Sequence, residues 1–236
     1  TIPEIDLNNE WWNKNAVKDL NLCDKIFFAT GDITTRYVTS AFVLAFNKNL
    51  FDDYNINYPY NDVYEGVWTI DKLTSTVKGM AYDVDNDDKY TNDDFYGLVY
   101  EGGSQYSFFV GSGESIVKTN NEGLPELVSS AESTLNAIGT LIDKLVSDDF
   151  YSPAVTYDAN KIFKNSRSLY IAFAGCDLSL LRDMDDEFGI LPIPKYDDNQ
   201  ENYYNPVSLG CANFISIPVT ATDLERTGII IEALSC

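Results

Sequence analysis

The sequence contains no histidine, and this absence excludes several classes of chemistry. Ser-His and Cys-His nucleophile pairs need a histidine base, and histidine is also the commonest metal ligand. The four cysteines, Cys23, Cys176, Cys211 and Cys236, show no CxxC spacing, which argues against zinc and thioredoxin-type sites. Their wide separation fits either long-range disulfides or buried free thiols, and we favour free thiols. GxSxG, P-loop and HExxH motifs are missing as well.

Basic residues are scarce, since 16 Lys and Arg face 37 Asp and Glu for a net charge of −21. A chain this acidic is repelled by phosphate backbones, so we expect no nucleic-acid partner. Aromatic residues are abundant at 14% of the chain. They suit flat, partly polar ligands, although an aromatic core with a Tyr-rich surface explains the same content.

The stretch 167–196 predicts a strand, a turn, a short helix and a second strand. Ser168–Ala174 is an apolar run that ends at Gly175, and Asp177 follows at the position of a helix N-cap. Helical spacing continues to Phe188, Gly189 is the predicted helix stop, and 190–193 is the second strand. Two strands joined by a helix need a parallel crossover, so the protein is predicted to be α/β with a right-handed βαβ unit. The turn Gly175–Asp177 is the first candidate ligand site, because ligands of α/β sheets gather at such turns.

Further elements follow from the same patterns. Strands are expected at 25–29, 41–47, 96–100 and 210–218. Helices are expected at 48–54, after a Thr69 cap, after Pro125, and after a Thr222–Glu225 capping box. The helix after Pro125 is predicted to bury a stripe that includes Leu127, Leu135, Ile142 and Leu145.

The acidic segment Asp83–Asp94 resembles an EF-hand calcium loop in the order of its ligands. Asp83, Asp85, Asp87 and Asp94 lie at loop positions one, three, five and twelve, and Lys89 lies at position seven. Position six is Asp88 instead of the usual Gly, so an acidic solvent loop is the competing interpretation. We expect any calcium bound here to be structural.

Several segments taken in order resemble a known family: FFATGDI, VLAFNKNLFDDYNI, EGVWTIDKL, DVDNDDKYTNDDFYGLV, LRDMDDEFGILPIPKYD and ISIPVTATDLERTGIIIEAL. The set is similar to the extracellular solute-binding proteins of ABC importers, the maltose-binding-protein-like group, and especially to Gram-positive lipoproteins. The resemblance implies a periplasmic-binding-protein-like lobe, a mixed sheet flanked by helices, with hinge strands and remnants of the other lobe. Residues 1–32 would end the first lobe and form a hinge strand, 33–205 the second lobe, and 206–236 the returning hinge strand and a helix.

The resemblance also implies where the solute binds, along the hinge and the loops that face the other lobe. By position these residues are Asp32, Thr35, Tyr37, Ser104, Gln105, Tyr106, Gly175, Cys176 and Asp177. Carboxylates and amides bind adjacent hydroxyls, and an aromatic ring packs on the C–H face of a sugar. For Asp177 a purely structural cap is the alternative. Tyr37 and Tyr106 are equally compatible with packed surface aromatics.

The resemblance implies a non-catalytic receptor for a solute, expected to be a carbohydrate, that delivers it to the membrane permease of an ABC importer and requires no cofactor. A glycoside hydrolase that uses two carboxylates is the alternative enzyme, and a calcium-dependent adhesion module is a third reading. The chain starts at Thr1 and stops at Cys236, so we expect a piece of a longer extracellular protein whose lipoprotein signal lies outside it. We also expect strands 25–29 and 213–217 to lie side by side, and the segments 1–22 and 219–236 to pack on one another or on a second copy.

Overall fold

The computed structural model describes residues 2–128, 131–146 and 158–236, and the chain divides into two compact units. Unit 1 comprises Thr1–Ser40, Val117–Val128 and Val207–Cys236. Unit 2 comprises Ala41–Ile116 and Ser129–Pro206. The units change after Ser40 and after Pro206, and the segment 117–128 lies in unit 1.

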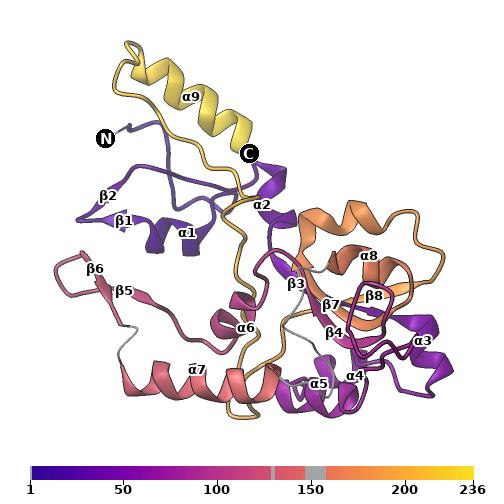
Figure 1. Ribbon diagram of the computed structural model, residues 1–236. Helices are drawn as coiled ribbons and strands as arrows, with labels where there is room; N and C mark the ends of the chain where they lie inside the picture. The colour runs from indigo at the N-terminus through magenta and orange to yellow at the C-terminus, as the bar shows by residue number, and fades with distance from the viewer. Residues whose placement is uncertain (1, 129–130, 147–157) are drawn as a thin grey trace. The chain divides into compact units, whose positions relative to one another are not determined.

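Unit 2 is built on a four-stranded mixed sheet in the order β4-β7-β3-β8 (Figure 1). The central strand β3 (Phe42–Asn47) is antiparallel to both β7 (Ser168–Ala174) and β8 (Phe188–Leu191). The edge strand β4 (Tyr96–Tyr100) is parallel to β7. The α/β class and the strands predicted for β3, β4 and β7 are confirmed.

The middle of the sheet is buried on both faces, which explains why its strands are apolar throughout. In β7, Tyr170 and Ala172 belong to one buried cluster, while Ile171 and Phe173 belong to the other. This alternation follows from the two-residue repeat of a strand. Helices therefore have to cover both faces.

The helices of unit 2 contribute to these two clusters. Leu73, Phe108 and Leu141 join the first cluster, and Ile162 and Leu181 join the second. The helical elements are α3 (Lys48–Asp53), α4 (Tyr60–Tyr64), α5 (Ile70–Val77), α6 (Tyr106–Gly111), α7 (Glu132–Leu145), α8 (Ala159–Lys164) and the 3₁₀ helix η1 (Gly175–Leu181). Thr69 Oγ1 accepts the Lys72 N–H at 3.4 Å, which confirms the predicted cap of α5.

The connection from β7 to β8 differs from the predicted βαβ unit. Both strands are antiparallel to β3, so they run parallel to each other with β3 between them. The connection starts with the short 3₁₀ helix η1 in place of an α-helix, and its cap residue is Ala174. The N-cap prediction for Asp177 is therefore wrong, because the helix begins earlier and Asp177 lies in its first turn.

Gly189 does not stop a helix, since it is buried inside β8. A Cβ at this position would lie 2.2 Å from Phe46 Cε1 and 2.3 Å from the Tyr60 hydroxyl oxygen. Real Cβ atoms essentially never make non-bonded contacts this short, so the glycine allows two aromatic side chains to approach the strand.

The longest helix, α7, begins at Glu132 and not near Pro125. Pro125 opens β6 (Pro125–Leu127), which pairs with β5 (Val117–Thr119) as a small antiparallel ribbon in unit 1. The buried face of α7 also differs from the apolar stripe that the sequence predicted. Leu135 and Ile142 are 55% and 54% exposed, and the buried positions of α7 are Thr134, Ala137, Leu141 and Leu145.

Unit 1 contains short elements joined by long loops. They are α1 (Lys14–Asp19), β1 (Asn21–Leu22), β2 (Lys25–Ile26), α2 (Thr35–Thr39), the β5–β6 ribbon and α9 (Leu224–Ser235). Asp223 caps α9 by accepting the Arg226 N–H at 3.0 Å, one residue after the predicted Thr222. Among the helices of the described residues, none has the length and apolar character that a membrane span needs.

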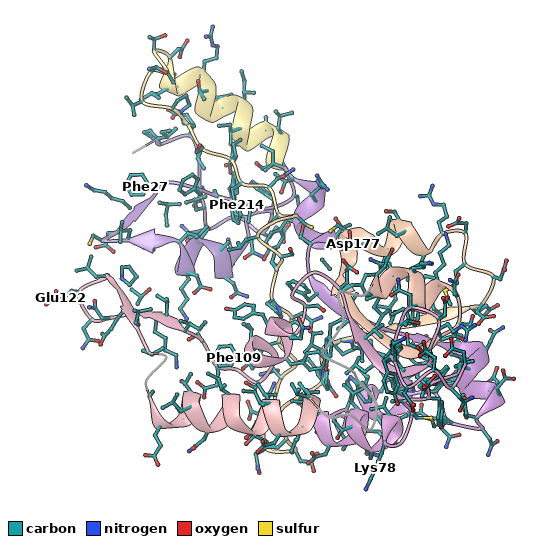
Figure 2. All side chains as sticks on the ribbon, in the orientation of Figure 1. Phe27, Lys78, Phe109, Glu122, Asp177 and Phe214 are labelled. Carbon is teal, nitrogen blue, oxygen red and sulfur yellow. The ribbon has the colours of Figure 1, made fainter. Side chains whose placement is uncertain are left out.

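The two expected hinge segments do lie side by side in unit 1. Ala29 and Ile215 exchange backbone hydrogen bonds of 3.0 and 2.8 Å, and Thr30 Oγ1 donates to Asn213 O at 2.9 Å. Regular strand is shorter than predicted, because β2 ends at Ile26 and Ile215 forms only an isolated bridge. Phe27 and Phe214, labelled in Figure 2, stay exposed on this part of unit 1.

The first and last segments of the chain also pack together, as expected. Glu232 of α9 accepts hydrogen bonds from Asn9 Nδ2 at 2.6 Å and from the Trp12 indole N–H at 3.1 Å. Trp12 is only 2% exposed. Gly228 faces Ile2, whose Cγ2 would lie 2.7 Å from an added Cβ. A glycine on α9 thus permits close packing of the two segments.

Candidate functional site

A candidate site lies in unit 2, at the end of the sheet where the parallel strands β4 and β7 finish. Tyr100 pairs with Ala172, and the Glu101 N–H donates to Ala172 O at 3.0 Å. Because the carboxyl ends of parallel strands share one edge, the segments 101–106 and 175–177 emerge beside each other. Six of the nine sequence-predicted solute residues lie in these two segments.

Ser104 is fully buried and holds the first segment in place. Its hydroxyl donates to Ala172 O at 2.6 Å, and its N–H donates to Glu101 O at 2.9 Å. The chain reaches Ser104 through Gly102 and Gly103, whose φ angles of +52° and +81° favour glycine. Ser104 therefore positions the turn, and its hydroxyl faces the protein interior.

The two residues after Ser104 are available at the surface. Gln105 is exposed, and Tyr106, the first residue of α6, is 48% exposed. The Tyr106 ring lies 6.0 Å from the Phe109 ring, centroid to centroid, at an interplanar angle of 37°. Packing against a buried phenylalanine fixes the tyrosine and leaves part of its ring free for a ligand.

In the second segment, Gly175 is buried and anchors the start of η1. Its N–H donates to Ala41 O at 2.8 Å, just before β3. Cys176 and Asp177 are half-buried, and the thiol sulfur lies 3.8 Å from Asp177 Oδ1. Asp177, labelled in Figure 2, thus lies at the carboxyl end of β7 with its carboxylate partly open to solvent.

Glu101 is a further candidate that the sequence did not reveal. Partial burial raises the pKa of its carboxyl group, and the nearby charges of Asp158 and Asp177 raise it further. The charges of Asp158 and Asp177 thus act on the Glu101 carboxyl group. The sequence signal that could have found Glu101 is its position directly after a strand, but the pairing of that strand with β7 was not evident.

The other three predicted residues belong to unit 1. Asp32 is exposed, and its N–H donates to Trp11 O at 2.9 Å. Thr35 is the first residue of α2. Tyr37 is half-buried, and burial, with a smaller effect of Asp19, raises the pKa of its phenol. One segment therefore holds all three, and unit 2 holds the other six.

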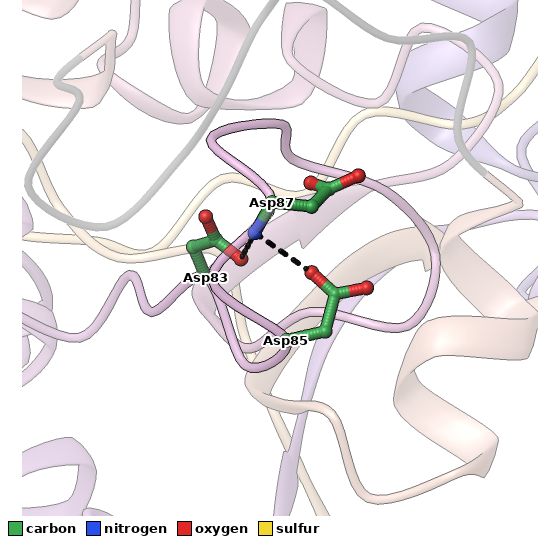
Figure 3. Close-up of side chains that lie close together, drawn as sticks. All are labelled: Asp83, Asp85 and Asp87. Carbon is green, nitrogen blue, oxygen red and sulfur yellow. Dashed lines mark hydrogen bonds between the residues drawn. The ribbon is translucent and has the colours of Figure 1, made fainter.

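The predicted calcium loop brings three of its carboxylates together, as Figure 3 shows. One oxygen from each of Asp83, Asp85 and Asp87 lies within 4.8 Å of the others. Asp83 and Asp85 both accept the Asp87 N–H, at 3.3 and 3.2 Å. Asp88 has a φ of +62°, so it supplies the turn for which EF-hands use glycine.

The remaining two loop residues make other contacts. Asp94 is 2% exposed, and its carboxylate accepts the N–H groups of Val84 and Thr91 at 2.8 and 2.7 Å. Lys89 Nζ lies 3.4 Å from Asp87 Oδ2. Asp94 thus closes the loop through backbone hydrogen bonds, and calcium binding by the three grouped carboxylates stays a prediction.

The structure supports the expectation of thiols, and not disulfides, for the cysteines. Cys23, Cys211 and Cys236 are free, although Cys23 and Cys236 are exposed where burial was expected. The Cys176 sulfur contacts the Asp177 carboxylate, as described above.

Comparison with solved structures identifies the fold. An ABC substrate-binding protein from Listeria monocytogenes, solved with cycloalternan, matches 98% of this chain at a TM-score of 0.61 and 16% identity. The maltose/maltodextrin-binding domain MalE from Bdellovibrio bacteriovorus, bound to maltotriose, matches 95% of this chain at a TM-score of 0.55 and 16% identity. A cyclo/maltodextrin-binding protein complexed with maltotetraose matches 86% of this chain at a TM-score of 0.51 and 14% identity. The chain therefore has the α/β fold of periplasmic-binding-protein-like lobes.

The match covers only part of those proteins. This chain spans 52%, 53% and 48% of their lengths, respectively. No protein-family model and no curated protein sequence matches the chain.

Proposed function

We propose that this chain is part of a carbohydrate-binding receptor of an ABC importer and that it acts without catalysis. The observation that carries the proposal is the fold match over nearly the whole chain to binding proteins solved with cycloalternan and maltotriose. The sugars bound by those proteins support a carbohydrate as the ligand class, and the sheet end in unit 2 offers side chains that suit one.

The chemistry of the sheet end fits a neutral sugar. Glu101 and Asp177 can accept hydrogen bonds from adjacent hydroxyls, and charged acceptors make the stronger bonds. Tyr106 offers part of an aromatic face for the C–H groups of a pyranose ring. Gln105 adds an amide that both donates and accepts. By the family resemblance, Asp32, Thr35 and Tyr37 of unit 1 are also proposed as solute-binding residues.

The wider role follows from the class. The receptor would be extracellular, held at the membrane by a lipid anchor outside this sequence, and would deliver sugar to a membrane permease. No cofactor is needed for such binding, and calcium at Asp83, Asp85 and Asp87 would stabilise the acidic loop. A chain that spans half of a two-lobed binding protein encloses its ligand incompletely, so we expect weaker binding than in a complete protein.

Calorimetry with maltotriose, combined with an assay for released reducing sugar, tests this function. We expect saturable binding without turnover. Tyr106→Ala should weaken binding about tenfold, the effect of roughly one lost ring contact and its burial. Tyr64→Ala is the matched control, because Tyr64 lies on α4 and is 86% exposed.

Other outcomes would redirect the assignment. Release of reducing sugar that Glu101→Gln abolishes would support the glycoside hydrolase, the second candidate, which needs two carboxyl groups such as Glu101 and Asp177. Sugar binding that is lost in chelator would favour a calcium-dependent adhesion module. An absence of binding to maltotriose and related oligosaccharides would contradict the sugar receptor.

A further inference from the structure

An open groove of about 740 Å³ lies on unit 2, away from the sheet end described above. Its walls come from α3, the loop after it, α4 and the start of α5 (Figure 1). The helix α3 follows the carboxyl end of β3, and β3 runs antiparallel to β7. The groove is therefore at the opposite end of the sheet from Glu101 and Asp177.

Two tyrosines form a fixed aromatic corner of the groove. The rings of Tyr58 and Tyr60 lie 6.4 Å apart at an angle of 87°, and both are half-buried. Their ring centroids lie 5.5 and 5.4 Å from that of Phe46 in the core. Contact with a buried ring holds both tyrosines in place, so a ligand would lose little affinity to ordering them.

Each charged side chain of the groove already has a partner within the groove. The Tyr58 hydroxyl donates to the Asp52 carboxylate at 2.9 Å, and the resulting bond raises the pKa of the phenol. Lys72 Nζ lies 3.2 Å from Asp62 Oδ1. These pairs leave the groove polar without a strong demand for a charged ligand.

The exposed amides of Asn57 and Asn61 complete the lining. Each amide offers two N–H donors and one acceptor oxygen, the combination that matches vicinal hydroxyl groups. Aromatic faces beside amides suit a ring with C–H groups on one side and hydroxyls at its rim. The volume lies within the range of about 300–1,000 Å³ that is usual for ligand sites.

We propose that this groove is a second carbohydrate site, which binds one or two neutral pyranose units through Tyr58, Tyr60 and the amides of Asn57 and Asn61. It is separate from the sheet end and does not depend on the function proposed there. Because an open groove encloses only part of a ligand's surface, we expect weak binding, with a dissociation constant of about 1 mM. Such a site would hold an oligosaccharide chain on the outer surface of the unit.

Nuclear magnetic resonance of the whole chain tests the proposal, with maltotriose as the probe and spermidine as a cationic comparison. The side-chain amide signals of Asn57 and Asn61 report directly on the groove. We expect maltotriose to shift them saturably at millimolar concentration, and spermidine to leave them in place. Signals of residues 101–106 report separately on the sheet end, so failure at one site is distinguished from failure at the other.

The double variant Asn57→Ala/Asn61→Ala should weaken binding at the groove about tenfold, read from the backbone signals around Tyr58 and Tyr60, since two hydrogen bonds are lost. Both side chains are exposed, so the fold should persist, which the remaining spectrum verifies. Asn136→Ala, an exposed site on α7, is the matched control and should change nothing. Groove signals that do not move with maltotriose, that move only with spermidine, or that titrate equally in the double variant would overturn the proposal.

Discussion

Replacing Asp94 with asparagine should destabilise unit 2 strongly, although the change is nearly isosteric. The Asp94 side chain is 2% exposed and accepts three hydrogen bonds. They come from the Val84 N–H at 2.8 Å, the Thr91 N–H at 2.7 Å and the Thr91 hydroxyl at 3.1 Å. Asparagine keeps one acceptor and directs an NH₂ group at N–H donors. With hydrogen bonds to a charged group worth about 1.5–3 kcal/mol each, the loss should be about 3 kcal/mol.

Urea unfolding followed by circular dichroism measures this loss, with Asp93→Asn as the matched control. Asp93 is exposed and adjacent, so its replacement should change the unfolding free energy by less than about 0.5 kcal/mol. The loss in Asp94→Asn should be the same in calcium and in chelator, because the partners of Asp94 are N–H and O–H groups of the protein. A loss below about 1 kcal/mol would refute the hydrogen-bond argument. A loss seen only in calcium would make Asp94 a metal ligand instead.

Two further predictions concern carboxylates at other positions. If Asp83, Asp85 and Asp87 bind calcium, the ion should raise the melting temperature of the wild-type protein and leave that of Asp85→Asn unchanged. A wild-type melting temperature that calcium does not change would contradict the calcium site. Burial and the Asp158 and Asp177 charges raise the pKa of Glu101 in the folded state, so the folded protein holds this proton more tightly than the unfolded chain. The stabilisation that this proton gives the folded state is present below the ordinary glutamate pKa. It is lost as the pH rises through the raised pKa of the folded state. Glu101→Gln should therefore gain stability over the wild type between acidic and neutral pH, and a constant difference across urea titrations in that range would contradict the shift.

The strands at the centre of unit 2 could be predicted because their environment is simple. Residues 42–47 and 168–174 are short apolar runs, and strands covered on both faces need apolar residues at every position. Nearly all of these side chains are buried. The pairing of Ala29 with Ile215 was predicted on a different basis, the family resemblance, because no local sequence pattern encodes it.

The segment after β7 shows where periodicity fails. Leu178, Leu181 and Met184 have helical spacing, yet the helix is a short 3₁₀ element that ends at Leu181. Its start is fixed by the hydrogen bond from Gly175 to Ala41, a residue far away in sequence. Phe188 was expected to end the helical face, but it begins β8 beside Asn47. Tertiary contacts at both ends thus leave too few residues for an α-helix.

The candidate site depends on tertiary contacts for the same reason. Glu101 and Ser104 both follow β4, and the sequence favoured the serine as a ligand residue. The pairing of Tyr100 with Ala172 decides otherwise, because it brings the Ala172 carbonyl to the serine hydroxyl and leaves the glutamate half-buried, where burial and the charges of Asp158 and Asp177 raise its pKa. A shift of one residue in this register would exchange the faces of the strand. Which polar side chain stays accessible at the candidate site is therefore a property of the β4–β7 register, and that register is set between segments that no short-range pattern connects.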